Sequence, residues 1–142
     1  MKTVHSIMEK KPKVVFSVTA STSVYEALQL MMDKNISALL IMEGSELQGI
    51  FTERDYARKI ILQGKASKTT AIEEVMTKNP IVVGPSEQVD RCMQIMTDMH
   101  IRHLPVFEND RVTGMISIGD ILKHLIEDQK DTIDHLKNYI QS

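Results

Sequence analysis

The feature that most constrains the fold of this chain is a short pattern that occurs at residues 49–55 and again at residues 114–120. Each copy has a glycine, two apolar residues, a hydroxyl residue, two variable residues and an aspartate. The copies stand 65 residues apart in similar surroundings. Repetition at a fixed spacing indicates internal duplication, so we expect two similar units.

An alignment of residues 14–62 on residues 79–127 supports the duplication, because it needs no gap. A unit of about 60 residues buries little surface alone, so we expect the two halves to pack against each other. Identical residues recur along the alignment: Val18/Val83, Ser21/Ser86, Val24/Val89, Gln29/Gln94, Met31/Met96, Asp33/Asp98, Ile36/Ile101, Leu39/Leu104, Glu43/Glu108, Gly49/Gly114 and Asp55/Asp120.

Apolar spacing and turn residues predict the order β-α-β-β-α in both units. In the first unit we expect strands at 14–18, 37–42 and 47–51, a helix opened by Ser23 and a helix after Thr52. In the second unit we expect strands at 81–83, 104–107 and 112–116, a helix opened by Ser86 and a helix after Ser117. The first helix is expected to bury one face: Val24, Ala27, Leu28, Met31 and Met32.

These elements place a first repeat at residues 1–64, a polar linker at 65–70, a second repeat at 71–128 and a helical tail at 129–142. A helical lead-in opens each repeat, since Ile72, Val75 and Met76 echo Val4, Ile7 and Met8. In the tail, apolar spacing resumes after the polar stretch 127–131, which predicts a short amphipathic helix. Such a helix must dock on its own module, on a second copy or on a partner. Its apolar residues are Ile133, Leu136 and Ile140.

Composition excludes several classes of protein. The net charge is −2 and no basic run occurs, so we expect no nucleic-acid partner. No apolar stretch approaches the ~18 residues of a membrane span, and the first residues lack the apolar core of a signal peptide. Cys92 is the only cysteine, which rules out an intrachain disulfide and favours a cytoplasmic location. Its apolar surroundings predict a buried, inert thiol.

The repeated motif has a structural and a chemical interpretation, and the two are compatible. Thr52 and Ser117 stand where a helix N-cap belongs, with Asp55 and Asp120 three residues later, as in a capping box. These residues are sufficient to start a helix and need do nothing else. A helix N-terminus also suits a phosphate, and an acceptor-only carboxylate beside it suits the hydroxyls of a ribose.

Together these features resemble the CBS (cystathionine β-synthase) domain family in its usual tandem pair, the Bateman module. The resemblance is carried by the duplicated motif, by Ile-Ser-Ala-Leu at 36–39 and by Arg-His-Leu-Pro-Val at 102–106. No second kind of domain is visible, so the chain looks like a stand-alone pair. The resemblance implies an α/β fold of two CBS-type repeats related by a pseudo-twofold axis, with two clefts between them.

In similar modules the clefts hold adenosine-containing ligands, so the resemblance implies AMP first, with NAD(H), ADP, ATP or S-adenosylmethionine as alternatives and no required metal. In the first cleft, Asp120 would hold the ribose, and Ser117 would face the phosphate. Arg102 and His103 would lie nearby. The other expected residues of this cleft are Phe16, Ser17, Ile36, Ala38 and Met115.

In the second cleft, the resemblance assigns the sugar and phosphate roles to Thr52, Arg54 and Asp55. The other expected residues of this cleft are Ser37, Ile81, Val82, Ile101 and His103. His103 can serve only one cleft fully, so its assignment stays open. The clefts are expected to differ in charge, because Arg54 corresponds to Gly119, and Ser37 and Ala38 correspond to Arg102 and His103.

Two functions fit these observations. The first is a regulatory nucleotide sensor that signals to a client protein, and the second is a dimerisation scaffold with vestigial clefts. An enzyme is not expected, since no nucleophile and base are paired. A metal site is not expected either, since His100 and His103 lack further ligands. Because CBS-like pairs often form disc-shaped homodimers, we also expect a homodimer, with residues 131–140 supporting it or docking a client.

Overall fold

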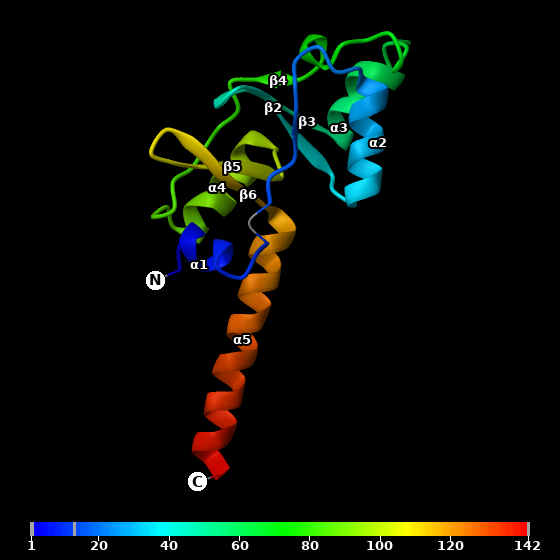
Figure 1. Cartoon of the computed structure of the whole chain (residues 1–142). Coiled ribbons are helices and arrows are strands. Elements are labelled where there is room, and N and C mark those ends of the chain that lie inside the picture. Colours follow the sequence, from blue (N-terminus) through cyan, green and yellow to red (C-terminus); the bar gives the residue numbers. More distant parts are fainter. Residues whose placement is uncertain (1, 13, 142) are drawn as a thin grey trace.

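A computed structural model describes residues 2–12 and 14–141, in which two β-hairpins are surrounded by helices (Figure 1). The first part of the chain contains α1 (Val4–Met8), β1 (Ser17–Val18), α2 (Val24–Lys34), β2 (Ala38–Glu43), β3 (Glu46–Thr52), α3 (Glu53–Asp55) and a π-helical segment (Tyr56–Ile61). The second part contains a 3₁₀ turn (Ile72–Glu74), β4 (Thr77–Lys78), α4 (Val89–Met99), β5 (His103–Glu108), β6 (Arg111–Ser117) and α5 (Ile118–Gln141).

The last two strands predicted in each repeat are confirmed, and the hairpins that they form are equivalent. β2 pairs antiparallel with β3, and β5 pairs antiparallel with β6. The registers match at the 65-residue offset, since Leu39 faces Phe51 and Leu104 faces Ile116. In the first repeat, β1 and β4 extend the hairpin to a sheet of order β1-β2-β3-β4. The fold is therefore a mixed α/β arrangement of two related repeats.

The strand predicted at 81–83 is wrong, and Pro105 provides the reason. In the first repeat the backbone N–H of Leu40 donates to the Phe16 carbonyl across 3.4 Å. Pro105 stands at the position equivalent to Leu40 and has no N–H to donate to Ile81. Only an isolated bridge between Val83 and Val106 forms.

Three smaller predictions also need correction. Within the strand expected at 14–18, only residues 17 and 18 are extended in a ladder. The helix expected to open at Ser86 begins at Val89, with Gln88 as its N-cap. Met32 is 75% exposed, because it lies one position beyond the buried Met31 and turns away from the core. Ser23 does cap α2, accepting a hydrogen bond from the Glu26 N–H across 3.1 Å.

The lead-in segment that opens each repeat in the sequence packs into the core of the other repeat. Val4 and Ile7 of α1 are buried in the core of the second repeat, whereas Ile72 and Val75 are buried in the core of the first. The backbone contacts are equivalent as well. The Val4 N–H donates to Glu87 across 2.9 Å, and the Ile72 N–H donates to Thr22 across 2.8 Å. The two repeats are thus interlocked.

The packing of the lead-ins leaves no room for a side chain at either motif glycine. A Cβ added to Gly114 would overlap the terminal methyl of Met8, which belongs to α1. A Cβ on Gly49 would lie 2.6 Å from the sulfur of Met76 and 2.7 Å from the Thr77 carbonyl oxygen. Both lead-ins therefore press a methionine against the glycine of the opposite motif strand.

The tail differs from its prediction. Instead of a separate short helix after a polar break, α5 is one continuous helix of 24 residues. Residues 127–131 contain neither glycine nor proline, so nothing in that stretch ends a helix. The C-terminal part of α5 extends away from the rest of the molecule (Figure 1), and all its described residues from 129 onward are exposed.

The glycine packing leads to a first prediction. Gly49→Ala should lower the free energy of unfolding by about 1–3 kcal/mol, as overpacking does, because a backbone carbonyl blocks the new methyl. Gly114→Ala should lower it by less, since only the mobile end of Met8 must move. Urea denaturation of the two variants measures the difference. An equal or larger loss for Gly114→Ala would contradict the packing described here.

Candidate functional site

The two motifs form equivalent hydrogen-bonded helix starts. At α5 the Ser117 backbone N–H donates to Asp120 Oδ2 across 2.9 Å, and the Asp120 N–H donates to Ser117 Oγ across 3.1 Å. At α3 the Thr52 N–H donates to Asp55 Oδ2 across 3.0 Å, and the Asp55 N–H donates to Thr52 Oγ1 across 3.2 Å. Both capping boxes predicted from the sequence are confirmed.

The residues that precede each hairpin are brought beside the motif helix. The Glu53 N–H donates to the Ser37 carbonyl across 3.2 Å, and the Ile118 N–H donates to the Arg102 carbonyl across 2.9 Å. These are equivalent bonds at the 65-residue offset. Each bond therefore places the residue before a hairpin beside the hydroxyl–aspartate pair of its own repeat.

Asp120 has a charged partner that the sequence reading missed. The Lys11 ammonium donates to Asp120 Oδ2 across 2.7 Å and also donates to the Met115 carbonyl oxygen. Burial alone would raise the pKa of the Asp120 carboxyl, but hydrogen bonds from Lys11 and Ser117, with the Lys11 charge, bring its pKa below the ordinary value. Lys11 follows α1, so the lead-in exchange places a cation directly on the motif carboxylate.

His103 joins the two repeats at the same place. Its Nε2 lies 3.0 Å from the hydroxyl oxygen of Ser37. Burial, and then the positive charges of Lys11 and Arg102, lower the pKa of the imidazole, and the negative charge of Asp120 only partly opposes them. A lowered pKa makes the neutral imidazole the main form at neutral pH. His103 therefore acts as a hydrogen-bonding group between the halves.

Asp55 is held differently from Asp120. Its Oδ1 lies 3.3 Å from the Lys59 ammonium and accepts a hydrogen bond from the Thr77 hydroxyl across 3.4 Å. Arg54 donates to the His100 carbonyl of the other repeat across 2.6 Å. The second repeat cannot copy the Lys59 contact, because the equivalent residue is His124, which is only 8% exposed. The two motif carboxylates thus carry non-equivalent lysine partners.

Of the other residues expected in the clefts, the structure brings together one pair that spans the repeats. Ala38 is buried in an apolar cluster against which Met115 packs, so this pair does lie between the repeats. Phe16 and Ile36 pack against the core of the first repeat, and Ile81 and Ile101 pack against that of the second. Arg102, Ser17 and Val82 have exposed side chains.

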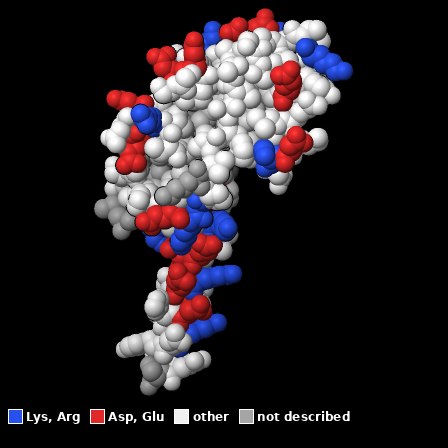
Figure 2. All heavy atoms as spheres, in the orientation of Figure 1, with Lys and Arg blue, Asp and Glu red and all other residues white. Residues whose placement is uncertain are grey.

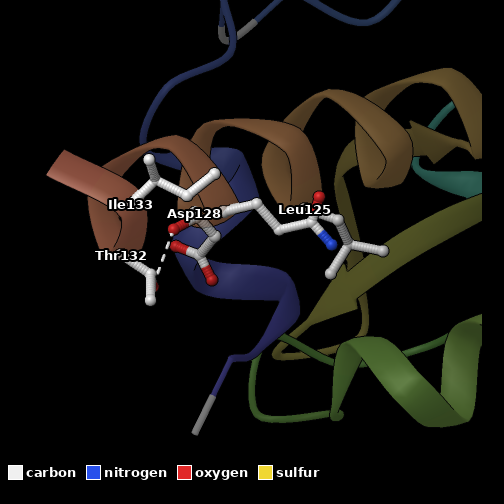
Figure 3. Close-up of a pocket in the computed structure, with 5 residues that line it drawn as sticks. Leu125, Asp128, Thr132 and Ile133 are labelled. Atoms are coloured by element: carbon white, nitrogen blue, oxygen red, sulfur yellow. Dashed lines mark hydrogen bonds between the residues drawn. The ribbon is translucent and has the colours of Figure 1, made fainter. Parts of the chain in front are cut away.

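Neither of two hollows on the described surface is lined by a motif aspartate. One, of about 370 Å³, runs along α5 (Figure 3) and is lined by Leu125, Asp128, Gln129, Thr132 and Ile133. The other, of about 320 Å³, lies beside α1 and is lined by His5, Met8, Glu9, Pro85, Val106, Glu108 and Thr113. A ligand at Asp120 or Asp55 would have to displace the ammonium group of Lys11 or Lys59.

Two further properties concern residues 2–12 and 14–141. Within these ranges no three histidine, cysteine or acidic side chains are grouped as a metal site would require. No helix in the described part of the chain is long and apolar enough to cross a membrane.

Cys92 is fully buried, and this burial, followed by the charge of Glu87, raises the pKa of its thiol to about 11. The prediction of a buried thiol is confirmed.

Comparison with known proteins gives a consistent family. The CBS domain model matches residues 4–62 and 72–127. The mitochondrial CBS domain-containing protein CBSX3 of Arabidopsis thaliana is 38% identical over an alignment of 148 positions. The alignment covers 98% of this chain and 72% of that protein. A solved structure of a protein with CBS domains from Burkholderia ambifaria MC40-6 is 46% identical, with a TM-score of 0.87 over 90% of this chain and 96% of that one.

A further solved structure contains bound ligands. The CBS domain pair of protein MJ0100, in complex with 5′-methylthioadenosine and S-adenosyl-L-methionine, is 29% identical to this chain. The similarity has a TM-score of 0.79 and covers 90% of this chain and 98% of that one. Both of its ligands contain adenosine.

The Lys11–Asp120 pair leads to a second prediction. Because the folded-state pKa of Asp120 is depressed, the pair stabilises the fold fully above the unfolded-state pKa of about 3.9. That stabilisation is lost as the pH falls through the folded-state pKa. Lys11→Met should therefore lower the free energy of unfolding by about 1 kcal/mol at neutral pH. The difference from the unmodified protein should shrink in acid.

Carboxyl NMR measures the same linkage directly. The pKa of Asp120 should rise in Lys11→Met. An Asp120 titration curve identical in both proteins would show that the ammonium does not act on this carboxyl.

Proposed function

Because the chain belongs to the CBS domain family, we propose that it is a regulatory module that binds an adenosine-containing ligand and signals to a partner protein. The observation that carries this proposal is the intact hydroxyl–aspartate pair at the helix start of both repeats. Such a start supplies free N–H groups and partial positive charge for a phosphate. The carboxylate beside it is an acceptor for two ribose hydroxyls.

In the first proposed cleft, Asp120 binds the ribose, and Ser117 and the α5 N-terminus face the phosphate. Lys11 moves from the carboxylate to the phosphate as the ligand enters, which keeps the ammonium paired. Arg102 adds positive charge, and His103 offers a hydrogen bond. The base lies among Phe16, Ser17, Ile36, Ala38 and Met115.

In the second proposed cleft, Asp55 binds the ribose, with Thr52 and Arg54 on the phosphate side. The base lies near Ser37, Ile81, Val82, Ile101 and His103. Arg54 must leave the His100 carbonyl and Lys59 must leave Asp55 for this cleft to fill. Those two rearrangements make the second cleft the weaker one in this proposal.

AMP is the ligand we propose first, with ADP, ATP, NAD(H) and S-adenosylmethionine as alternatives and no metal required. The adenosine ligands of the MJ0100 domain pair support this chemical class. We propose no catalytic turnover, a homodimer as the working state and a client protein as the receiver of the signal. A cytoplasmic location stays a prediction from the sequence, and a relative is mitochondrial by name.

A ligand-independent scaffold is the second candidate. It is favoured by the lysine partner that each motif carboxylate already has. A carboxylate neutralised within the chain needs no ligand, and these ion pairs would then only fix the helix starts. Nucleotide titration separates the two candidates.

Thermal unfolding provides a third prediction. If the dissociation constant for AMP is about 10 μM, 1 mM AMP should stabilise the folded state by roughly 2.7 kcal/mol. For a chain of this size the melting temperature should then rise by roughly 5–10 °C. The absence of a shift with every adenine nucleotide at millimolar concentration would favour the scaffold.

The fourth prediction concerns the motif carboxylates. Asp120→Ala should weaken AMP binding to the first cleft by tenfold or more, since charge-assisted hydrogen bonds contribute roughly 1.5–3 kcal/mol each. Asp55→Ala should do the same for the second cleft. Calorimetric titration of folded variants measures both, with Asp33→Ala as the matched control on an exposed helix surface. Unchanged affinity in both motif variants would refute the assigned role.

A further inference from the structure

α5 carries an exposed apolar stripe that no element of the described chain covers. Its members are Leu122, Ile126, Ile133, Leu136 and Ile140, which are between 48% and 80% exposed. Successive steps are of four or three residues once Gln129 is included between Ile126 and Ile133. This alternation is the heptad spacing of a coiled coil. We call these six residues the α5 seam.

The residue types in the seam favour a particular kind of pairing. Isoleucine occupies one set of heptad positions, at 126, 133 and 140. Leucine occupies the other set at 122 and 136, and a polar Gln129 lies between them. β-Branched residues at the first set, with leucine at the second, favour a coiled coil of two parallel helices. A single buried polar residue lowers stability but specifies register and partner number.

The shape of α5 supports the same occupant. The hollow of about 370 Å³ is lined in part by Gln129, Thr132 and Ile133, so it lies along the seam (Figure 3). In a coiled coil each apolar side chain inserts between four residues of the facing helix. Gln129, Thr132 and Ile133 are three neighbouring corners of one such hole. The hollow therefore lies partly where a parallel partner helix would insert a side chain.

The charges beside the seam decide the orientation. Lys123, Lys130 and Lys137 follow one flank, whereas the other flank has Leu125, Thr132 and Tyr139. Two antiparallel helices would bring the lysine flanks together, and like charges would repel. Two parallel helices instead place the lysines of each copy against the uncharged flank of the other. Acidic residues alternate with the lysines along α5 (Figure 2). Asp131 and Asp134 lie on the outer face, whereas Asp128 borders the hollow and is paired with Lys2.

We propose that the α5 seam pairs with the α5 seam of a second copy as a parallel two-stranded coiled coil. This geometry covers the apolar stripe, places Gln129 opposite its counterpart and joins two modules at the same end of the pair. The inference rests on the proposed homodimer but not on nucleotide binding. The exposed part of α5, residues 129–141, is short enough to be marginal in water without a partner, which gives the second copy a stabilising role.

Sedimentation equilibrium of the full chain and of matched variants tests the seam. Gln129→Leu should tighten the dimer at least tenfold, and Leu136→Lys should weaken it at least tenfold. Asp131→Leu adds the same apolar surface on the outer face and should leave the dimerisation constant unchanged. A dimer that responds equally to Gln129→Leu and Asp131→Leu, or to neither, would overturn the coiled coil while leaving the homodimer intact. A monomer throughout would overturn both.

Oxidative cross-linking tests the orientation. Ile140→Cys should form a disulfide with its own counterpart, because parallel pairing puts the two residues opposite each other. Asn138→Cys, on the outer face, is the control and should not cross-link. Cys92 does not compete, since it is buried and its thiol pKa is about 11. Cross-linking between Ile140→Cys and Leu122→Cys in a mixture would demonstrate antiparallel helices and overturn the proposal.

Discussion

Val4 and Ile7 are buried in the core of the second repeat, and Ile72 and Val75 are buried in the core of the first. Each fully buried aliphatic side chain contributes roughly 1.5–3 kcal/mol, so the four together contribute about 6–12 kcal/mol. That is comparable with the whole stability of a small domain. Neither repeat has a complete core of its own, and the pseudo-twofold arrangement follows from this reciprocal exchange.

The exchange also determines the chemistry of the motifs. Because α1 lies on the second repeat, the chain that follows it brings Lys11 to Asp120. The Ser37–His103 and Arg54–His100 hydrogen bonds then connect the repeats at the same junction. A ligand that displaces Lys11 or Arg54 would act on contacts between the halves. Binding at a motif would thereby be coupled to the packing of the two repeats, as a signalling module requires.

Local sequence patterns predicted a large part of this structure, whereas contacts between residues far apart in the sequence could not be predicted from them. The capping boxes at Thr52 and Ser117 and both hairpins follow from residue types a few positions apart, so the sequence predicted them. Lys11 lies 109 positions from Asp120, and no periodicity relates the two. The lost strand at 81–83 depends on Pro105, whose missing N–H matters only once the partner strand is known.

A crystal structure of the protein grown with AMP shows directly whether the motif carboxylates bind ribose. We expect density for an adenosine at the junction, with both ribose hydroxyls on Asp120 and the Lys11 ammonium moved to the phosphate. Asp120 still paired with Lys11 at saturating AMP, with the nucleotide absent or bound elsewhere, would contradict ribose binding by this carboxylate.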